Sequence, residues 1–114
     1  MSNTTSTSRW RSKRTDETKK VEEVLREAGF SRVDAYRYNS ASIRVRVIDP
    51  RFENLSPEER DRMVEPALDR LPEGTQTDIM SLLTFAPSEI ESGQQTTQES
   101  FLNSEFENPS PSML

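Results

Sequence analysis

The spacing of the apolar residues changes after Gly29, from a helical period to a strict alternation. Before Gly29, apolar residues recur three and four positions apart, which places them on one face of a helix predicted over 16–28. After Phe30, apolar and polar residues alternate over 33–38 and 42–48, with a polar tip between the two runs. This pattern predicts an antiparallel hairpin, because successive side chains of a strand point to opposite faces.

The second strand of this hairpin separates two kinds of side chain. Ile43, Val45 and Val47 share one face of the strand, whereas Arg44 and Arg46 share the other. We therefore expect one face of the sheet to be buried in the core, and the other to be solvated or to bind something.

A helix-start signal follows the hairpin. Ser56 can act as the N-cap, Pro57 fits the first helical position, and Glu59 completes a capping box. Pro66 falls inside the apolar stripe of this helix, where proline removes a hydrogen bond and clashes with the preceding turn. We expect either two short helices or one kinked helix there, followed by an apolar third strand over 78–85.

The predicted order α-β-β-α-(α)-β corresponds to a two-layer α+β sandwich, in which a three-stranded sheet carries its helices on one side. We place this domain at 16–87. Only 31% of the chain is hydrophobic, and the flanks are poorest in apolar residues. We therefore expect the basic segment 1–15 and the acidic segment 88–114 to be disordered. Phe101-Leu102 and Phe106 in the acidic segment are either a short docking motif that orders on binding or merely scattered apolar residues.

The composition excludes several classes of function. The chain has no Cys and no His, which removes disulfides, thiolate nucleophiles, imidazole acid–base chemistry and the usual zinc sites. Neither a glycine-rich phosphate-binding loop nor a catalytic constellation is visible in the sequence, so we expect no enzymatic activity and no cofactor. There is no run of apolar residues long enough for a membrane span or a signal peptide, so we expect a cytoplasmic protein.

Phe52 follows the second predicted strand, and Arg60 and Arg62 precede the apolar pair at 63–64 on the predicted helix. With this order of elements, the middle of the chain resembles the BolA family, which has a type II KH-like topology. That family typically has a Phe-x-Gly motif after its second strand, and an Arg-His-Arg followed by apolar residues on its central helix. Phe52, Arg60, Arg62 and the apolar pair at 63–64 fall on matching positions, and the resemblance spans about residues 21–85.

Three positions depart from the family pattern. Asn54 stands where the family has glycine, and asparagine also adopts left-handed conformations. Asp61 and Asp78 replace two histidines, the second of which is associated in the family with an iron–sulfur cluster shared with a monothiol glutaredoxin. Because carboxylate is a harder ligand than imidazole, we expect no cluster here. If the two aspartates meet, they could hold a hard cation. We favour instead the interpretation that the two do not form a site: Asp61 is an exposed carboxylate of the helix, and Asp78 opens the third strand.

The leading functional hypothesis is a small, non-catalytic, regulatory protein-interaction module of the BolA-like kind. Its expected partner-binding residues are Phe52, Arg60, Asp61, Arg62 and Asp78. The resemblance implies a glutaredoxin-like protein as the partner. We expect a monomer or a weak dimer, because an exposed edge strand of a three-stranded sheet can pair with a second copy.

The alternative hypothesis belongs to a different class, a KH-like nucleic-acid-binding module. Arg37, Arg44 and Arg46 would form a basic sheet face, and Arg9 and Arg11 would belong to a basic N-terminal arm. Two features argue against this hypothesis: the middle segment 21–85 carries a net charge of −4, and the turn between the helices lacks the Gly-x-x-Gly loop of KH domains. The basic arm could equally fold back onto the acidic segments.

Overall fold

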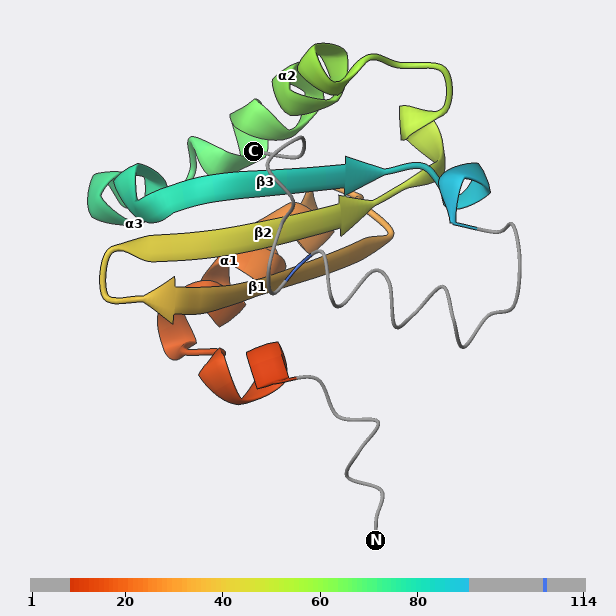
Figure 1. Cartoon of the computed structure of the whole chain (residues 1–114). Helices are drawn as coiled ribbons and strands as arrows, with labels where there is room; N and C mark the ends of the chain where they lie inside the picture. Colours follow the sequence, from red (N-terminus) through yellow and green to blue (C-terminus); the bar gives the residue numbers. More distant parts are fainter. Residues whose placement is uncertain (1–8, 91–105, 107–114) are drawn as a thin grey trace, which may run out of the picture.

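The computed structural model describes residues 9–90 and Phe106. This part of the chain contains three α-helices and a three-stranded sheet, together with short 3-10 helices (Figure 1). Along the chain the elements are η2 (Arg9–Lys13), α1 (Asp16–Glu27), β1 (Arg32–Asn39), β2 (Ser42–Ile48), η3 (Pro50–Phe52), α2 (Pro57–Leu68), α3 (Glu73–Asp78), β3 (Ile79–Phe85) and η4 (Pro87–Glu89). The predicted order of helices and strands is confirmed.

The sheet is mixed, with strand order β1-β2-β3. β1 and β2 form the predicted antiparallel hairpin, in which Ala35 lies opposite Val45. β2 and β3 are parallel, and Val45 lies opposite Leu82. Parallel strands need a crossover connection, and here the segment that contains α2 and α3 provides it.

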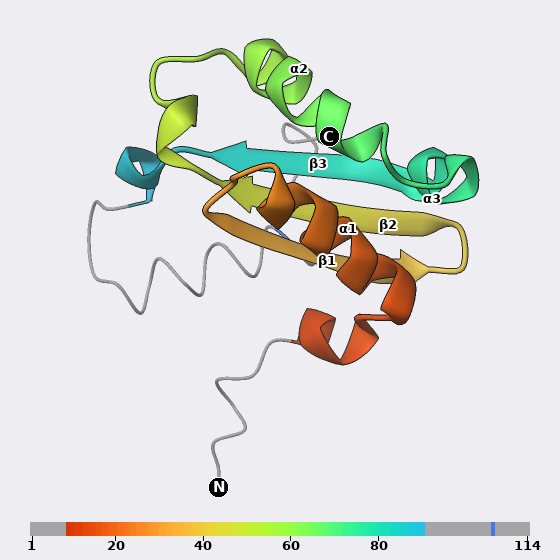
Figure 2. The same cartoon turned by 180° about the vertical axis from the view of Figure 1, so that it is seen from behind.

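α1 and α2 lie on the same face of the sheet, which we call the inner face (Figures 1 and 2). The fold is therefore the predicted two-layer α+β sandwich. Its core combines the alternating side chains of the hairpin with the apolar stripes of both helices, because each element has one apolar side to bury. The buried core residues are Val21, Val24, Leu25, Phe30, Val33, Ala35, Ile43, Val45, Val47, Phe52, Val64, Ala67, Leu71 and Ala86.

The local signals for the ends of the helices act as predicted, and of the two alternatives at Pro66 the structure has a single helix. Ser56 and Glu59 form a reciprocal capping box at the start of α2. Pro66 lies inside α2, and the helix continues for two residues to Leu68. The next helix, α3, begins at Glu73 instead of at Pro66. A proline this close to the end of a helix removes one hydrogen bond without dividing the helix in two.

Two backbone positions have positive φ, and both follow from their residue types. Gly29 follows the end of α1 with φ +99°, a conformation that glycine adopts without steric cost. Asn54 has φ +63° in the loop before α2. Asparagine tolerates this left-handed conformation better than most residues other than glycine do.

The face of the sheet opposite α1 and α2, which we call the outer face, carries a second apolar cluster. This outer cluster consists of Trp10, Tyr36, Leu83 and Phe106, with Phe85 packed against it. Trp10 lies in η2 and is 2% exposed, so ordered structure begins before residue 16, where we expected the domain to start. The rest of the expected tails, residues 1–8, 91–105 and 107–114, lies outside the described residues.

Candidate interaction surface

Two of the residues expected to bind a partner lie inside the fold. The Phe52 side chain is fully buried, and its ring centroid lies 5.9 Å from that of Phe30. Arg60 is 7% exposed and donates to the carbonyl oxygens of Leu55 and Thr84. Both Arg60 terminal nitrogens also donate to Glu89, which lowers the pKa of that carboxyl group. These contacts join α2 to β3 and η4, so Phe52 and Arg60 support the fold.

Asp61 and Arg62 lie at the surface of α2. Asp61 is half-buried, and Arg62 is exposed. Burial raises the pKa of Asp61, and the negative charges of Glu65 and Glu58 raise it further. Within residues 9–90 and Phe106, there is no group of three or more Asp or Glu side chains that could hold a metal ion.

Asp78 belongs to a network of side chains at the end of the sheet. It was expected to open the third strand, but it is the last residue of α3, and β3 begins at the next residue, Ile79. Asp78 accepts a 2.7 Å hydrogen bond from Arg37 of β1. Arg37 also donates to Glu17 of α1 at 2.7 Å, and Thr75 of α3 donates to the other oxygen of Glu17. The hydrogen bonds from Thr75 and Arg37 lower the pKa of Glu17. Arg37 and Asp78 therefore tie three elements together.

Arg44 and Arg46 project from β2 onto the outer face, as the alternation predicts, but they differ in exposure. Arg46 is fully buried and forms a 2.7 Å ion pair with Asp34 of β1. Its guanidinium carbon lies 4.6 Å from the ring centroid of Phe106 and 5.5 Å from that of Trp10. Arg44 is half-buried, with its guanidinium carbon 3.7 Å from the centroid of the exposed Tyr38 ring.

Phe106 occupies the centre of the outer cluster. Its ring meets Tyr36 edge-on at 4.9 Å between centroids and Trp10 edge-on at 5.1 Å. The Phe106 carbonyl accepts hydrogen bonds from the Tyr36 hydroxyl at 3.0 Å and from Arg44 at 3.4 Å. A residue from the end of the chain is thus held by its ring and by its backbone in a seat made by η2, β1 and β2.

Exposed cationic side chains lie beside this seat on η2. Arg9, Arg11 and Lys13 of η2 are all exposed. The guanidinium carbon of Arg11 lies 4.9 Å from the Trp10 ring centroid, and Lys13 Nζ lies 5.9 Å from that of Tyr38. The two residues expected in a basic N-terminal arm, Arg9 and Arg11, therefore lie on an ordered turn beside the outer face.

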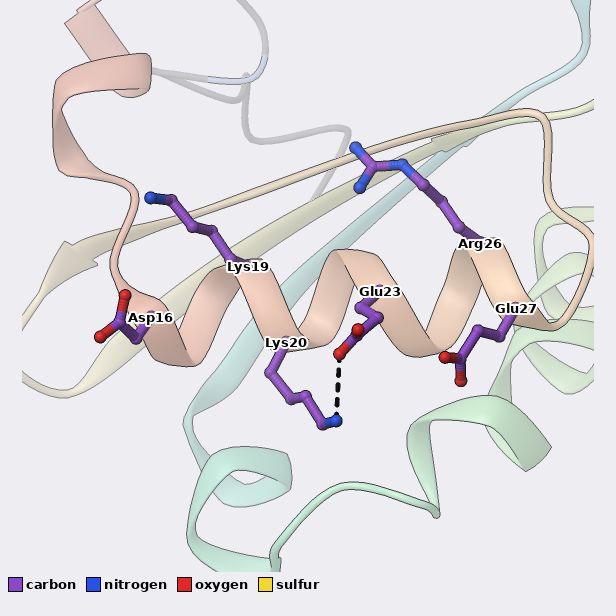
Figure 3. A pocket seen from close by; sticks show the side chains of 6 residues that line it. All are labelled: Asp16, Lys19, Lys20, Glu23, Arg26 and Glu27. Atoms are coloured by element: carbon purple, nitrogen blue, oxygen red, sulfur yellow. Dashed lines mark hydrogen bonds and ion pairs between the residues drawn. The ribbon is translucent and has the colours of Figure 1, made fainter.

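A shallow hollow on α1 has a different character (Figure 3). Six charged side chains of both signs line it, namely Asp16, Lys19, Lys20, Glu23, Arg26 and Glu27. Lys20 and Glu23 already form a 3.0 Å ion pair. Because its lining is all on one helix, exposed and of mixed sign, the hollow has neither the enclosure nor the charge focusing of a ligand site.

Phe106 was expected to belong either to a docking motif or to scattered apolar residues, and its contacts with Trp10 and Tyr36 were not predicted. No periodic pattern links these residues, because Trp10 and Phe106 lie in apolar-poor flanks. The available signal was weaker: the only tryptophan of the chain sits inside a basic run.

Comparisons with known proteins return no family model, no curated protein and no solved structure that matches this chain. The BolA-like resemblance and the glutaredoxin-like partner therefore stay predictions. Within the described residues, no helix is both long enough and apolar enough to cross a membrane.

Proposed function

We propose that this protein is a small, non-catalytic protein-interaction module whose binding surface is the outer face of the sheet. One observation carries the proposal: Phe106 is fully buried against Tyr36, which lies 70 positions earlier in the chain. A side chain that reaches this seat from outside the sandwich behaves as a peptide ligand would.

The contacts at the seat are of the right size for peptide binding. Burial of a phenylalanine side chain contributes about 1.5–3 kcal/mol, and each edge-on aromatic pair adds about 0.5–1.5 kcal/mol. The hydrogen bond from Tyr36 to the backbone contributes about 1 kcal/mol. The gross total is about 3.5–7 kcal/mol, from which the entropy cost of association is subtracted. We therefore expect a short anchored segment to bind weakly in trans, with a Kd between about 10 µM and 1 mM.

The nucleic-acid alternative draws less support from the same face. The Arg46 guanidinium is buried against Phe106 and paired with Asp34. Arg37 was expected on the same face, but it lies opposite Ile43 on the helix side of the sheet, between the carboxylates of Glu17 and Asp78. A phosphate would have to displace these acidic partners. The peptide hypothesis needs no such exchange, because the seat already accommodates a peptide residue.

A glutaredoxin-like protein remains the partner that the BolA-like resemblance suggests. Because Phe52 and Arg60 are buried, the α2 region would offer such a protein mainly the exposed Arg62 and the half-buried Asp61. Charge reversal at Arg62 would test this second surface separately from the outer face.

The test of the proposal uses full-length Phe106→Ala protein and a synthetic peptide of residues 103–110 as the probe. Trp10 is the only tryptophan and lies in the seat, so its fluorescence reports occupancy directly. We expect saturable binding of this peptide and none of the same peptide with Phe106→Ala. Full-length Phe101→Ala protein is the matched control and should retain the wild-type emission spectrum. If the Phe106→Ala protein does not bind the native peptide, the proposal is wrong.

A further inference from the structure

The charges beside the seat are opposite in sign to the charges that flank Phe106 in the sequence. In the sequence, Phe106 stands between Glu105 and Glu107, in a segment from 86 to 114 that contains no Lys or Arg. The rim of the seat carries the opposite sign, since Arg9, Arg11 and Lys13 of η2 are exposed beside it. Charges arranged in this way speed association and select partners of the matching sign.

The seat also distinguishes among hydrophobic side chains. The Arg46 guanidinium carbon lies 4.6 Å from the Phe106 ring centroid, a contact that favours an aromatic ring over an aliphatic side chain. Tyr36 and Arg44 bind the backbone carbonyl of the same residue, which fixes the position of the anchor whatever residues flank it. Together these groups recognise an aromatic anchor within an acidic segment.

We propose, on the basis of the proposed function, that the outer face binds partner proteins through a phenylalanine flanked by acidic residues. The chain's own Phe106 is then an internal competitor, which a partner displaces in order to bind. This arrangement makes the module self-inhibited.

The strength of this inhibition follows from simple competition. A tethered segment acts at an effective concentration of about 1 mM. If the free peptide binds the vacated seat with a Kd of about 100 µM, the tethered segment occupies roughly nine tenths of the molecules. Wild-type protein should therefore bind an external peptide about tenfold more weakly than the Phe106→Ala protein does.

The experiment compares wild-type, Phe106→Ala and Phe101→Ala full-length proteins. Three fluorescein-labelled probes are titrated while their fluorescence anisotropy is followed, because exchange of one phenylalanine for another in the wild-type seat leaves the surroundings of Trp10 unchanged. The probes are the 103–110 peptide, the same peptide with Glu105→Gln and Glu107→Gln, and a mixed single-stranded oligonucleotide. Each titration is run at about 50 mM and about 300 mM NaCl, because salt screens the exposed charges. We expect the Phe106→Ala protein to bind the native peptide about tenfold more tightly than wild type does. The glutamine peptide should bind about fivefold more weakly and with less salt dependence. Phe101→Ala should behave as wild type.

Each outcome bears on a different part of the reasoning. Equal binding of the native and glutamine peptides would overturn the acidic preference and leave the proposed function intact. Equal affinities of wild-type and Phe106→Ala proteins would overturn the internal competition. Tighter binding of the oligonucleotide than of the peptide to the Phe106→Ala protein would identify nucleic acid as the ligand instead. Phe106→Leu, which keeps an apolar side chain without the ring, provides a second variant and should release the seat only in part. Far-ultraviolet circular dichroism confirms that both variants fold.

Discussion

Glu22 offers the sharpest test of how this small fold is stabilised. It lies on α1 with a side chain only 1% exposed, and its carboxylate accepts a 2.9 Å hydrogen bond from the Ala35 amide of edge strand β1. Arg14 also donates to both carboxylate oxygens, and Arg26 makes a longer contact of 3.5 Å. Glu22 thus accepts the hydrogen bond of the Ala35 N–H, which the pairing of β1 with β2 does not use. Through Arg14 it also holds the segment that carries Trp10.

The expected cost of Glu22→Ala can be estimated from these contacts. The loss of the acceptor leaves the buried Ala35 amide unsatisfied, which costs about 1–3 kcal/mol. Arg14 and Arg26 are 33% and 55% exposed, so water replaces much of their interaction, and we add only about 1 kcal/mol for the ion pairs. We therefore predict a destabilisation of about 3 kcal/mol, equivalent to a fall in Tm of roughly 10–20 °C for a domain of this size. Glu22→Gln, which keeps the acceptor, should cost about half as much.

Urea unfolding followed by Trp10 fluorescence and circular dichroism measures both variants. Glu23→Ala is the matched control on the same helix: Glu23 is exposed and pairs with the exposed Lys20, so the substitution should cost less than about 0.5 kcal/mol. The reasoning is refuted if Glu22→Ala and Glu23→Ala are equally stable. It also fails if Glu22→Gln costs as much as Glu22→Ala, since the hydrogen bond to Ala35 would then contribute nothing.

Three further predictions concern single positions in and around the loop before α2. Asn54→Gly should leave thermal stability nearly unchanged, whereas Asn54→Ala should cost about 1 kcal/mol in urea unfolding, because only the alanine side chain opposes φ +63°. Burial and the charges of Glu65 and Glu58 raise the pKa of Asp61, so the folded chain binds that proton more tightly than the unfolded chain does. Ionised Asp61 therefore destabilises the fold at neutral pH, and the penalty disappears as the pH falls below the unfolded pKa of about 3.9. Asp61→Asn should accordingly stabilise the protein by about 0.5 kcal/mol at pH 7, with no gain near pH 3 in pH-dependent unfolding curves. Phe52→Ala should destabilise by about 3–5 kcal/mol, and a small effect on urea unfolding would contradict its placement in the core.

The sequence predicted the elements well because their signals are local. The alternation at 42–48 gives β2 its observed bounds, and the capping box at Ser56 marks the start of α2. Pro66 was harder to interpret, since its effect depends on how soon the helix ends. The pairing of β3 beside β2 in a parallel sense follows from the crossover connection and has no signal within the strand itself.

The candidate site required the tertiary structure. Phe52 and Arg60 match a family motif, yet the sequence alone does not reveal that both side chains point into the fold. Arg46 was expected on a solvated or binding face, and the structure buries it between aromatic rings instead. Two of the rings beside it, Trp10 and Phe106, come from opposite flanks of the chain, so no window of the sequence contains them together.

The sequence by itself determined the order of helices and strands and which side of β2 enters the core. It could do so because the spacing of apolar residues, the capping residues and the prolines are local signals, which act between residues a few positions apart. The burial of the outer face depends on contacts among Trp10, Tyr36 and Phe106. Trp10 and Phe106 are separated by most of the chain's length. Such contacts form only after the sandwich has brought η2 and β1 together. Tertiary structure alone therefore decided that the basic sheet face is an aromatic seat with a phenylalanine already in it.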